Sequence, residues 1–188
     1  TLDTLRIKTE ADSLFTIADS LRQAWELDEA LELYQGALGN YQQIADMGNE
    51  ARALKEVGLV YYYLGNLNKA LPFFENQLTL LRKLYDHLEE GKTISNIGVI
   101  YRNLGNYPKA LEYFQNSLDI RIEINDRLGE SYTLYNIGCV YEVLSDYPKA
   151  QEFFDKSLDI AIEVSDTRCK GNAFEGLGSI YSDLSEYP

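Results

Sequence analysis

Several side chains in the middle of the chain could bind an anionic group. Arg52, Lys55, Lys92 and Arg102 are basic, and Glu56 is the only acid among them. Guanidinium and ammonium groups form charge-assisted hydrogen bonds with carboxylates, and an arginine can do so through two N–H groups at once. These residue types favour recognition of an acidic or carboxylate-bearing peptide over a chemical reaction.

A second set of residues could supply neutral contacts to such a peptide. An asparagine amide carries a donor and an acceptor, so it can pair with an extended backbone without reading its side chains. Tyrosine adds contact area at little entropic cost. The candidates of these kinds, together with one cysteine, are Tyr62, Asn96, Tyr132, Tyr135, Asn136 and Cys139. Any one of them could instead belong to a solvated helix face, and the asparagines could equally bond to a neighbouring helix end.

The residue patterns that catalysis or metal binding would need are missing from the sequence. His87 is its one histidine, and the separation of Cys139 and Cys169 matches no metal or redox motif. No glycine-rich phosphate loop and no nucleophile with a plausible base are present. We therefore expect no catalytic site, no cofactor and no metal. We also expect two reduced thiols in a cytoplasmic protein, because a disulfide would require close Cα atoms.

The net charge disfavours two classes of partner. Seventeen Lys and Arg against thirty Asp and Glu leave a formal charge of −13. Such a chain repels the phosphates of nucleic acids and of anionic membranes. The sequence also has no apolar run of ~18 residues and no signal peptide. The expected partner is a protein or peptide, with no nucleic acid and no membrane.

A forty-residue repeat organises the chain and must position these side chains. We call the residues that stand at the same position of successive repeats a column. The most regular columns are Gly58, Gly98, Gly138 and Gly178; Tyr61, Tyr101, Tyr141 and Tyr181; Leu64, Leu104, Leu144 and Leu184; and Asp46, Asp86, Asp126 and Asp166. A repeat of this length predicts stacked units that complete one another's core. The predicted units of this single array over 1–188 are 10–48, 49–88, 89–128, 129–168 and a truncated half repeat, 169–188.

Each repeat predicts two helices, A and B, and no strand. In the third repeat Ile97, Gly98 and Tyr101 share one face of a helix A, and Pro108 stands in the first turn of a helix B. We expect the glycine column to face the alanines of helix B, which would let the two helices approach closely. We expect the column tyrosines to be core residues. Pro72 should remove one backbone hydrogen bond from its helix or bend it.

These columns resemble the tetratricopeptide repeat. In the third repeat Ile97-Gly98 and Tyr101 of helix A, then Ala110 and Phe114 of helix B, match its pattern. The second and fourth repeats match in the same register, whereas the first is weaker because Ala18 replaces the glycine. The period is forty residues instead of about thirty-four. Repeats of this length are similar to those of Pins-type adaptors, kinesin light chains and bacterial signalling arrays. The bacterial arrays often precede a caspase-like CHAT domain.

The resemblance implies an all-α fold, a right-handed superhelical α-solenoid of antiparallel helix pairs. It implies protein binding in a concave groove lined by helix A, where the ten candidate residues above would lie, and no catalysis. We therefore expect a protein-interaction scaffold that is a fragment of a larger regulatory protein. The alternative is a peptide-sensing module whose superhelix pitch changes on binding, which would gain thermal stability from its peptide.

The C-terminal residues raise a further expectation. Pro188 would open a fifth helix B, so the helix A that contains Phe174, Leu177 and Tyr181 would lack its partner. Solenoid ends without a polar cap expose apolar surface. We expect the natural chain to continue beyond this point, and residues 1–188 alone to fray there or to self-associate through this end.

Overall fold

The computed structural model describes residues 1–186, with side chains up to residue 182, as a series of α-helices. Nine helices and no strand occur in this range, which confirms the predicted all-α class. Their bounds are α1 (Leu2–Gln23), α2 (Leu27–Gln43), α3 (Met47–Tyr63), α4 (Leu67–Leu84), α5 (His87–Asn103), α6 (Tyr107–Glu123), α7 (Arg127–Val143), α8 (Tyr147–Glu163) and α9 (Thr167–Glu186). Odd-numbered helices are helices A of the repeat, and even-numbered helices are helices B.

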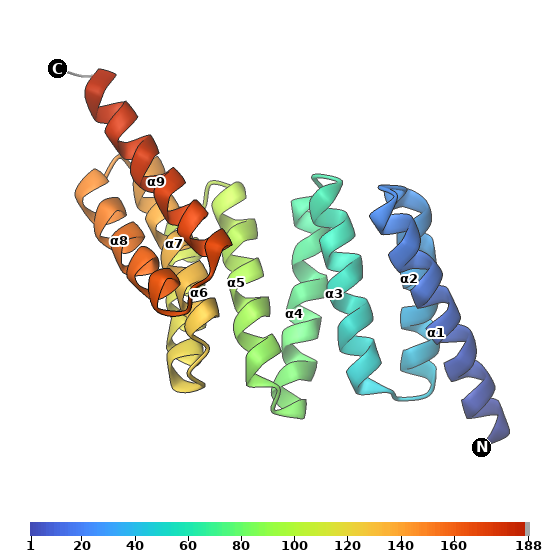
Figure 1. The fold of residues 1–188 in the computed structure, drawn as a ribbon. Helices are drawn as coiled ribbons and strands as arrows, with labels where there is room; N and C mark the ends of the chain where they lie inside the picture. The colour runs from blue at the N-terminus through green and yellow to red at the C-terminus, as the bar shows by residue number, and fades with distance from the viewer. Residues whose placement is uncertain (187–188) are drawn as a thin grey trace. The chain divides into compact units, whose positions relative to one another are not determined.

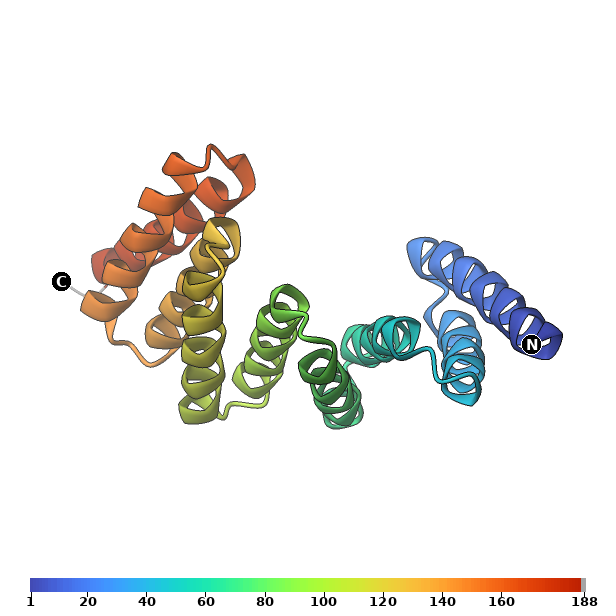
Figure 2. The same ribbon diagram turned by 90° about the horizontal axis from the view of Figure 1, so that it is seen from below.

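The helices form two compact units. Unit 1 comprises Thr1–Asp86 with α1 to α4, and unit 2 begins at His87 and contains α5 to α9. Within each unit consecutive helices run antiparallel and lie side by side (Figures 1 and 2). Each helix A therefore packs against its own helix B and against the helix B before it, where one is present in the unit.

A left-handed residue at every twentieth position closes each helix. From residue 25 to residue 165 these residues have φ between 55° and 75°. After α3, the Gly65 N–H donates to the Tyr62 carbonyl at 2.9 Å and the Asn66 N–H donates to the Tyr61 carbonyl at 2.8 Å. This pair of bonds satisfies carbonyls that a helix end would otherwise leave unpaired. Glycine fills only two of these positions, so most of the junctions carry no glycine signal in the sequence.

The aspartate column begins the next helix directly after the left-handed residue. The carboxylates of Asp46, Asp126 and Asp166 accept backbone N–H groups three residues ahead, at 3.2, 3.0 and 2.7 Å. Each caps the N-terminus of a helix A, where the free N–H groups and the helix dipole favour an anion. Part of the negative charge of the chain is thereby used to start its helices.

Gly58, Gly98 and Gly138 of the glycine column each face a phenylalanine ring of helix B, and not the alanine that we predicted. A Cβ atom at Gly98 would lie 2.7 Å from Phe114, and one at Gly138 would lie 2.6 Å from Phe154. Both rings are fully buried. Glycine is needed in helix A because the ring of its own helix B occupies the space that a side chain would take.

The column tyrosines lie at the edge of the core. Tyr61, Tyr101 and Tyr141 are half-buried and stack on an aromatic ring of their own helix B at 5.5, 5.3 and 5.5 Å between centroids. A lysine ammonium lies over each ring at 5.7, 4.9 and 5.1 Å, which adds a cation–π contact. Tyr181 is 61% exposed, so the prediction of a core position fails for this residue.

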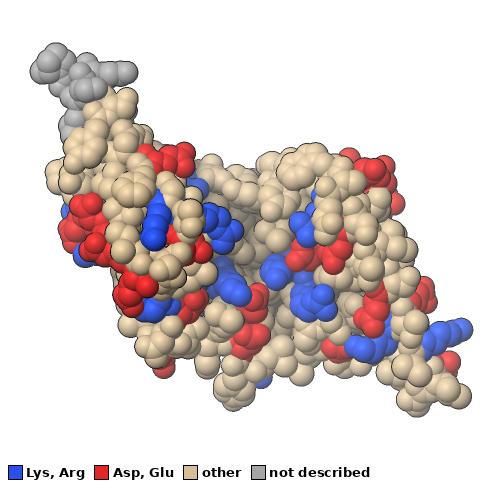
Figure 3. Space-filling view, in the orientation of Figure 1, with Lys and Arg blue, Asp and Glu red and all other residues tan. Residues whose placement is uncertain are grey.

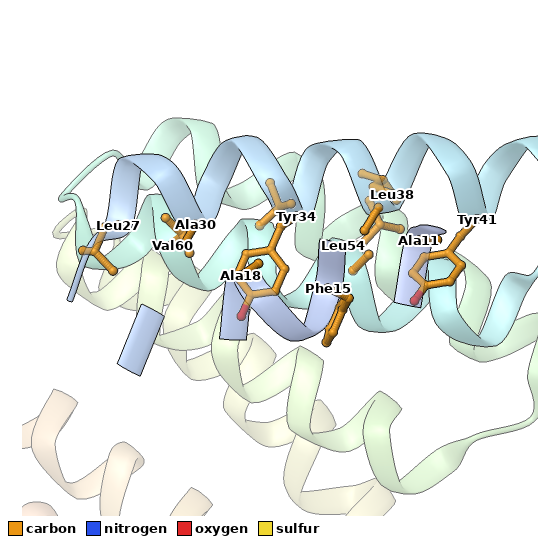
Figure 4. Close-up of a cluster of buried hydrophobic side chains, with 13 residues drawn as sticks. Ala11, Phe15, Ala18, Leu27, Ala30, Tyr34, Leu38, Tyr41, Leu54 and Val60 are labelled. Carbon is orange, nitrogen blue, oxygen red and sulfur yellow. The ribbon is translucent and has the colours of Figure 1, made fainter. Parts of the chain in front are cut away.

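The core of unit 1 joins α1, α2 and α3. Phe15 of α1 and Tyr34 of α2 pack edge to face with ring centroids 5.2 Å apart, next to the fully buried Ala18 (Figure 4). Leu54 and Val57 of α3 join the same cluster. Burying each such large side chain contributes about 1.5–3 kcal/mol, so most of the stability of the helix pairs comes from these faces. α4 continues through Pro72, which supplies no N–H to the helix and does not end it.

A buried arginine network in unit 2 was not predicted. The Arg121 side chain of α6 is 8% exposed, and its guanidinium donates to Asp126 at 2.7 Å and to the Ser117 hydroxyl at 3.2 Å. A Cβ atom at Gly129 would fall 1.5 Å from the Arg121 guanidinium. Burial lowers the pKa of Arg121 more than Asp126 raises it. The network ties α6 to the cap of α7.

Candidate functional site

The helix-A face of unit 2 brings five of the candidate residues together. α7 contacts both α5 and α9. The Arg102 guanidinium of α5 donates to the Asn136 side-chain oxygen of α7 at 3.2 Å. The Asn136 amide in turn donates to the carbonyl of Tyr132 at 3.0 Å, one turn earlier in α7. Tyr135 and Cys139 complete the set on α7. We call the surface formed by Arg102, Tyr132, Tyr135, Asn136 and Cys139 the Arg102 face.

The charge of Arg102 is not neutralised by its hydrogen-bond partner. Asn136 is uncharged and contributes only its amide dipole, so the contact leaves the positive charge of the guanidinium intact. Arg102 and Asn136 are both half-buried, so part of each side chain stays accessible. Arg102 stands in the last turn of α5, so Asn136 bonds to the end of a neighbouring helix, as one alternative from the sequence had it, and its amide bonds within its own helix.

The remaining side chains of the Arg102 face are polar groups on an apolar support. The Tyr135 ring packs on Phe154 with centroids 5.5 Å apart, and burial raises the pKa of its hydroxyl. The hydroxyl of Tyr132 is buried and has no hydrogen-bond partner in the described part of the chain. Burial also raises the pKa of the Cys139 thiol. The nearby Arg102 lowers this pKa, and the acids Glu142 and Glu175 raise it further. A thiol of this kind is protonated at neutral pH and is a weak nucleophile.

Unit 1 carries the same contact with a charged partner. Arg22 of α1 and Glu56 of α3 stand at the repeat positions of Arg102 and Asn136, eighty residues earlier. The Arg22 guanidinium lies 3.4 Å from the Glu56 carboxylate. It also donates to the Tyr34 hydroxyl at 3.1 Å, and this hydroxyl in turn donates to Asp19. Here the arginine is compensated by a carboxylate.

Glu56 is the residue that sequence reasoning undervalued. Its side chain is only 13% exposed, and one carboxylate oxygen has no hydrogen-bond partner. Burial raises the pKa of this carboxyl more than Lys55 and Arg22 lower it. Its isolation among basic residues was visible in the sequence, but its contact with Arg22 was not, because the first repeat departs from the column pattern at Ala18.

The other predicted residues of unit 1 lie along α3. The Arg52 guanidinium donates to Asn49 at 3.0 Å and lies 4.8 Å from the centre of the Phe15 ring. The Lys55 ammonium is 4.0 Å from Glu56. The Tyr62 ring packs against Tyr63 at 5.8 Å. These contacts place the three residues on one helix without assembling them into a single cluster.

Lys92 and Asn96 lie on α5 of unit 2, on the same helix as Arg102. The Lys92 ammonium forms an ion pair with Glu89 at 2.6 Å. The expectation that Glu56 is the only acid beside the predicted cations was therefore wrong, because Glu89 lies one turn from Lys92. On the face drawn in Figure 3, basic and acidic groups lie side by side in both units.

The cysteines and acids of the described residues form no metal or redox centre. Cys139 and Cys169 are both free, and Cys169 is buried at the start of α9. No group of three His, Cys, Asp or Glu side chains in this part of the chain could hold a metal ion. None of the helices described combines the length and the apolar character that crossing a membrane requires.

Comparison with solved structures shows which fold this is. BtubC (BKLC) from P. vanneervenii is 18% identical with a TM-score of 0.81, over 98% of this chain and 77% of that one. Aspartyl phosphate phosphatase F from Bacillus subtilis is 16% identical with a TM-score of 0.82, over 96% of this chain and 50% of that one. The kinesin light chain repeats of Podosopora anserina are 14% identical with a TM-score of 0.75, over 94% and 87%. The chain thus spans half the length of the Bacillus protein.

The family comparison agrees with this fold. None of the curated proteins compared with the chain matches it. The family model described as the tetratricopeptide repeat matches residues 9–83, 49–123 and 89–163. These overlapping matches extend over most of the sequence, and their starts are forty residues apart, as the columns are. The predicted resemblance and the predicted α-solenoid are confirmed. This chain belongs to the tetratricopeptide repeat family.

Proposed function

We propose that this chain is a protein-interaction module whose Arg102 face binds an acidic or carboxylate-bearing peptide. The observation that carries the proposal is the bond from Arg102 to the neutral Asn136. It fixes the direction of the guanidinium while leaving its charge available to a ligand. The equivalent arginine of unit 1, Arg22, is held next to the carboxylate of Glu56, so it is a poorer site.

A non-catalytic role in protein binding is the general property of this fold. One of the solved structures that it resembles is named a phosphatase, but an identity of 16% carries no activity over to this chain. The described residues bring no nucleophile together with a base. The two free thiols support a reducing, cytoplasmic compartment.

The chemistry of the Arg102 face suits a peptide carboxylate. A guanidinium can donate two parallel N–H groups to one carboxylate, which fixes its orientation as well as its charge. The rings of Tyr132 and Tyr135 would add contact area to the residues next to it. Lys92 and Asn96 lie farther along α5 and could meet a longer peptide. Arg52, Lys55 and Tyr62 of unit 1 are the remaining candidates for contacts of this kind.

The arginine of unit 2 is paired with Asn136 and that of unit 1 with Glu56, so exchanging these two residue types tests the proposal. Asn136→Glu should neutralise Arg102 and weaken binding of an acidic peptide by roughly tenfold or more, since one such charge contact is worth 1.4 kcal/mol or more. The change should be tolerated because unit 1 already holds an arginine and a glutamate in this geometry. The matched variant Glu56→Asn should free Arg22 and should not weaken binding.

The measurement is fluorescence anisotropy with labelled hexapeptides of three kinds. One ends in acidic residues and a free carboxylate, one has the same sequence with an amidated C-terminus, and one is neutral. Lys156→Glu on α8 serves as a control, because it changes the net charge in the same direction at an exposed site on a helix B. Equal affinity of Asn136→Glu and the unaltered chain for every acidic peptide would rule the Arg102 face out.

A further inference from the structure

An aromatic pair is exposed at the junction between α1 and α2 in unit 1. The ring of Trp25, which lies in this junction, and the ring of Tyr63, the last residue of α3, have centroids 5.5 Å apart and are tilted by 44° to each other. Trp25 is 66% exposed and Tyr63 is 42% exposed. Exposed aromatic groups that lie together in this way are typical of interaction sites.

The exposure of this pair comes from its place in the repeat. Gly105 and Val143 stand at the same repeat positions, eighty residues later, with helices before and after them in the chain. Gly105 is exposed, and Val143 is 57% exposed. The end of a helix A and the junction that follows it therefore stay open to solvent in the middle of the array as well.

The junction does not need a ring to close. The later junctions of the same kind are closed by Gly65, Gly105 and Ser145. Trp25 has φ 65°, and this left-handed backbone is unfavourable for a bulky side chain. Residues held in such a conformation cluster at sites that bind ligands. The tryptophan thus points to a use of its ring beyond closing the turn.

The first repeat also differs in the cation that the later repeats place over an aromatic ring. Lys69, Lys109 and Lys149 each lie over the column tyrosine of their own repeat. In the first repeat Leu21 replaces the tyrosine and Glu29 replaces the lysine. Glu26, directly after Trp25, is the N-cap of α2 and makes no side-chain capping bond. Both glutamates are exposed, and neither has an ion-pair partner in the described part of the chain.

A guanidinium group suits two exposed rings followed by two free carboxylates. It stacks on the face of an aromatic ring, most strongly on tryptophan, and its edge can donate two N–H groups to a carboxylate. The chain does not supply this group itself. Arg22, three residues before Trp25, is held by Glu56 and by the Tyr34 hydroxyl.

We propose that Trp25, Tyr63, Glu26 and Glu29, here called the Trp25 surface, bind an arginine side chain of a partner protein. The guanidinium face lies on the two rings, and its edge meets a glutamate. The Trp25 surface belongs to unit 1 and shares no residue with the Arg102 face of unit 2. The two surfaces take ligands of opposite charge, so each can fail without the other.

Trp25 is the one tryptophan of the chain, so its fluorescence reports this site directly. The probe is a hexapeptide of alternating glycine and arginine, titrated at 0.15 M salt to about 5 mM, because one side-chain contact gives a dissociation constant on the order of 0.1–1 mM. The arginine peptide should change the emission. A peptide with citrulline in place of arginine has nearly the same shape without the charge, and it should not. A neutral proline-rich peptide should not either, although aromatic surfaces can bind such segments.

NMR titration of the ¹⁵N-labelled chain measures the affinity of variants that lack the tryptophan. Trp25→Gly should raise the dissociation constant at least about tenfold, and it should fold because Gly65 and Gly105 close the same junction. Tyr85→Gly is the matched control, since Tyr85 is also exposed, at 79%, and left-handed, at φ 57°. It should leave the affinity unchanged.

A second pair of variants tests the carboxylates. Glu29→Lys restores the lysine of the later repeats and should weaken binding at least about threefold. Glu112→Lys makes the same change of net charge at an exposed position of α6 and should have no effect. Asn136→Glu, which tests the Arg102 face, should also leave this titration unchanged.

Three results would overturn the proposal. The first is an emission that no arginine peptide changes up to about 5 mM. The second is an equal response to the citrulline or the proline-rich peptide, since the charge would then not be recognised. The third is an equal loss of affinity in a variant and its matched control, because the acidic chain would then attract the peptide as a whole and not at the Trp25 surface.

Discussion

At the scale of single residues, Gly58, Gly98 and Gly138 mark the places where a phenylalanine ring of helix B packs against the backbone of helix A. Alanine at Gly138 would place its Cβ 2.6 Å from Phe154, and that ring is held from the other side by Gly176. We expect Gly138→Ala to destabilise the chain by about 1–3 kcal/mol, because the ring has no free space to move into. Gly39→Ala, at an open helical position, should instead stabilise it by up to about 1 kcal/mol.

Urea unfolding of the two alanine variants measures this difference. The two substitutions are chemically identical and both raise helix propensity, so only the contact with Phe154 separates them. An equal gain in both variants would show that the ring does not depend on the missing side chain.

Glu56 should make the stability of the chain depend on pH. Burial raises the pKa of its carboxyl in the folded state, so the folded chain holds a proton that the unfolded chain has released. Between the ordinary carboxyl pKa, about 4.3, and the raised folded pKa, the free energy of unfolding must fall as pH rises. The ionised carboxylate is thus a cost to the fold at neutral pH, despite the nearby Arg22.

Glu56→Gln should remove this part of the pH dependence. The unaltered chain should lose stability relative to the variant as pH rises through the window above about 4.3, which chemical unfolding at a series of pH values will show. Glu152→Gln, which removes an exposed carboxyl on α8, is the control. If the stability of the unaltered chain relative to Glu56→Gln stayed constant or rose with pH, the assignment would be contradicted.

At the scale of the helix, each junction depends on one left-handed residue. Ser145 has φ 58° and Gly105 has φ 75° at equivalent positions. A side chain in this region costs roughly 1–2 kcal/mol relative to glycine. Ser145→Gly should therefore stabilise the chain, whereas Gly105→Ala should destabilise it by a similar amount. Thermal unfolding measures both, and a loss on Ser145→Gly would mean that the serine side chain matters more than the backbone strain.

The cap of α7 should be worth more than the cap of α8. Asp126 accepts the N–H of Gly129 and also pairs with the buried Arg121, so Asp126→Ala leaves a buried guanidinium without its carboxylate. Such a loss costs about 3–5 kcal/mol. Asp146 caps α8 at an exposed site, and Asp146→Ala should cost only about 1 kcal/mol.

Urea unfolding of both aspartate variants is the measurement. Replacing Arg121 as well, as in Arg121→Met with Asp126→Ala, should recover part of the loss, because the unpaired charge is then gone. Equal costs at the two caps would show that Arg121 finds water or another partner.

At the scale of the whole molecule, the sequence was sufficient for the repeat and its helix pairs. The forty-residue columns arise because the same packing contact recurs in each unit, so their spacing predicts both helices and their register. The left-handed junctions were missed where serine or alanine fills them, since neither residue signals that backbone conformation. The packing of Phe154 against Gly138 was missed, because spacing shows which residues share a face of a helix but not which side chain fills the space beside a glycine.

The candidate site was predictable only as a set of residue types. Arg102 and Asn136 could be chosen because they flank the core face of helix A. Their hydrogen bond depends on the stagger between α5 and α7, which the sequence of one repeat does not contain. Arg22 and Glu56 stand at the same repeat positions, and comparing the two pairs separates an arginine paired with a carboxylate from one paired with an amide.

The net charge of −13 makes the salt dependence of peptide binding a test of the Arg102 face. Peptide binding at Arg102 joins opposite charges, so salt should weaken it. Screening shortens the range of this attraction from about 10 Å at 0.1 M salt to about 3 Å at 1 M. Anisotropy of the acidic peptide across this range should therefore show a falling affinity. An affinity that rises with salt would show that repulsion by the acids of the chain outweighs the contact with Arg102.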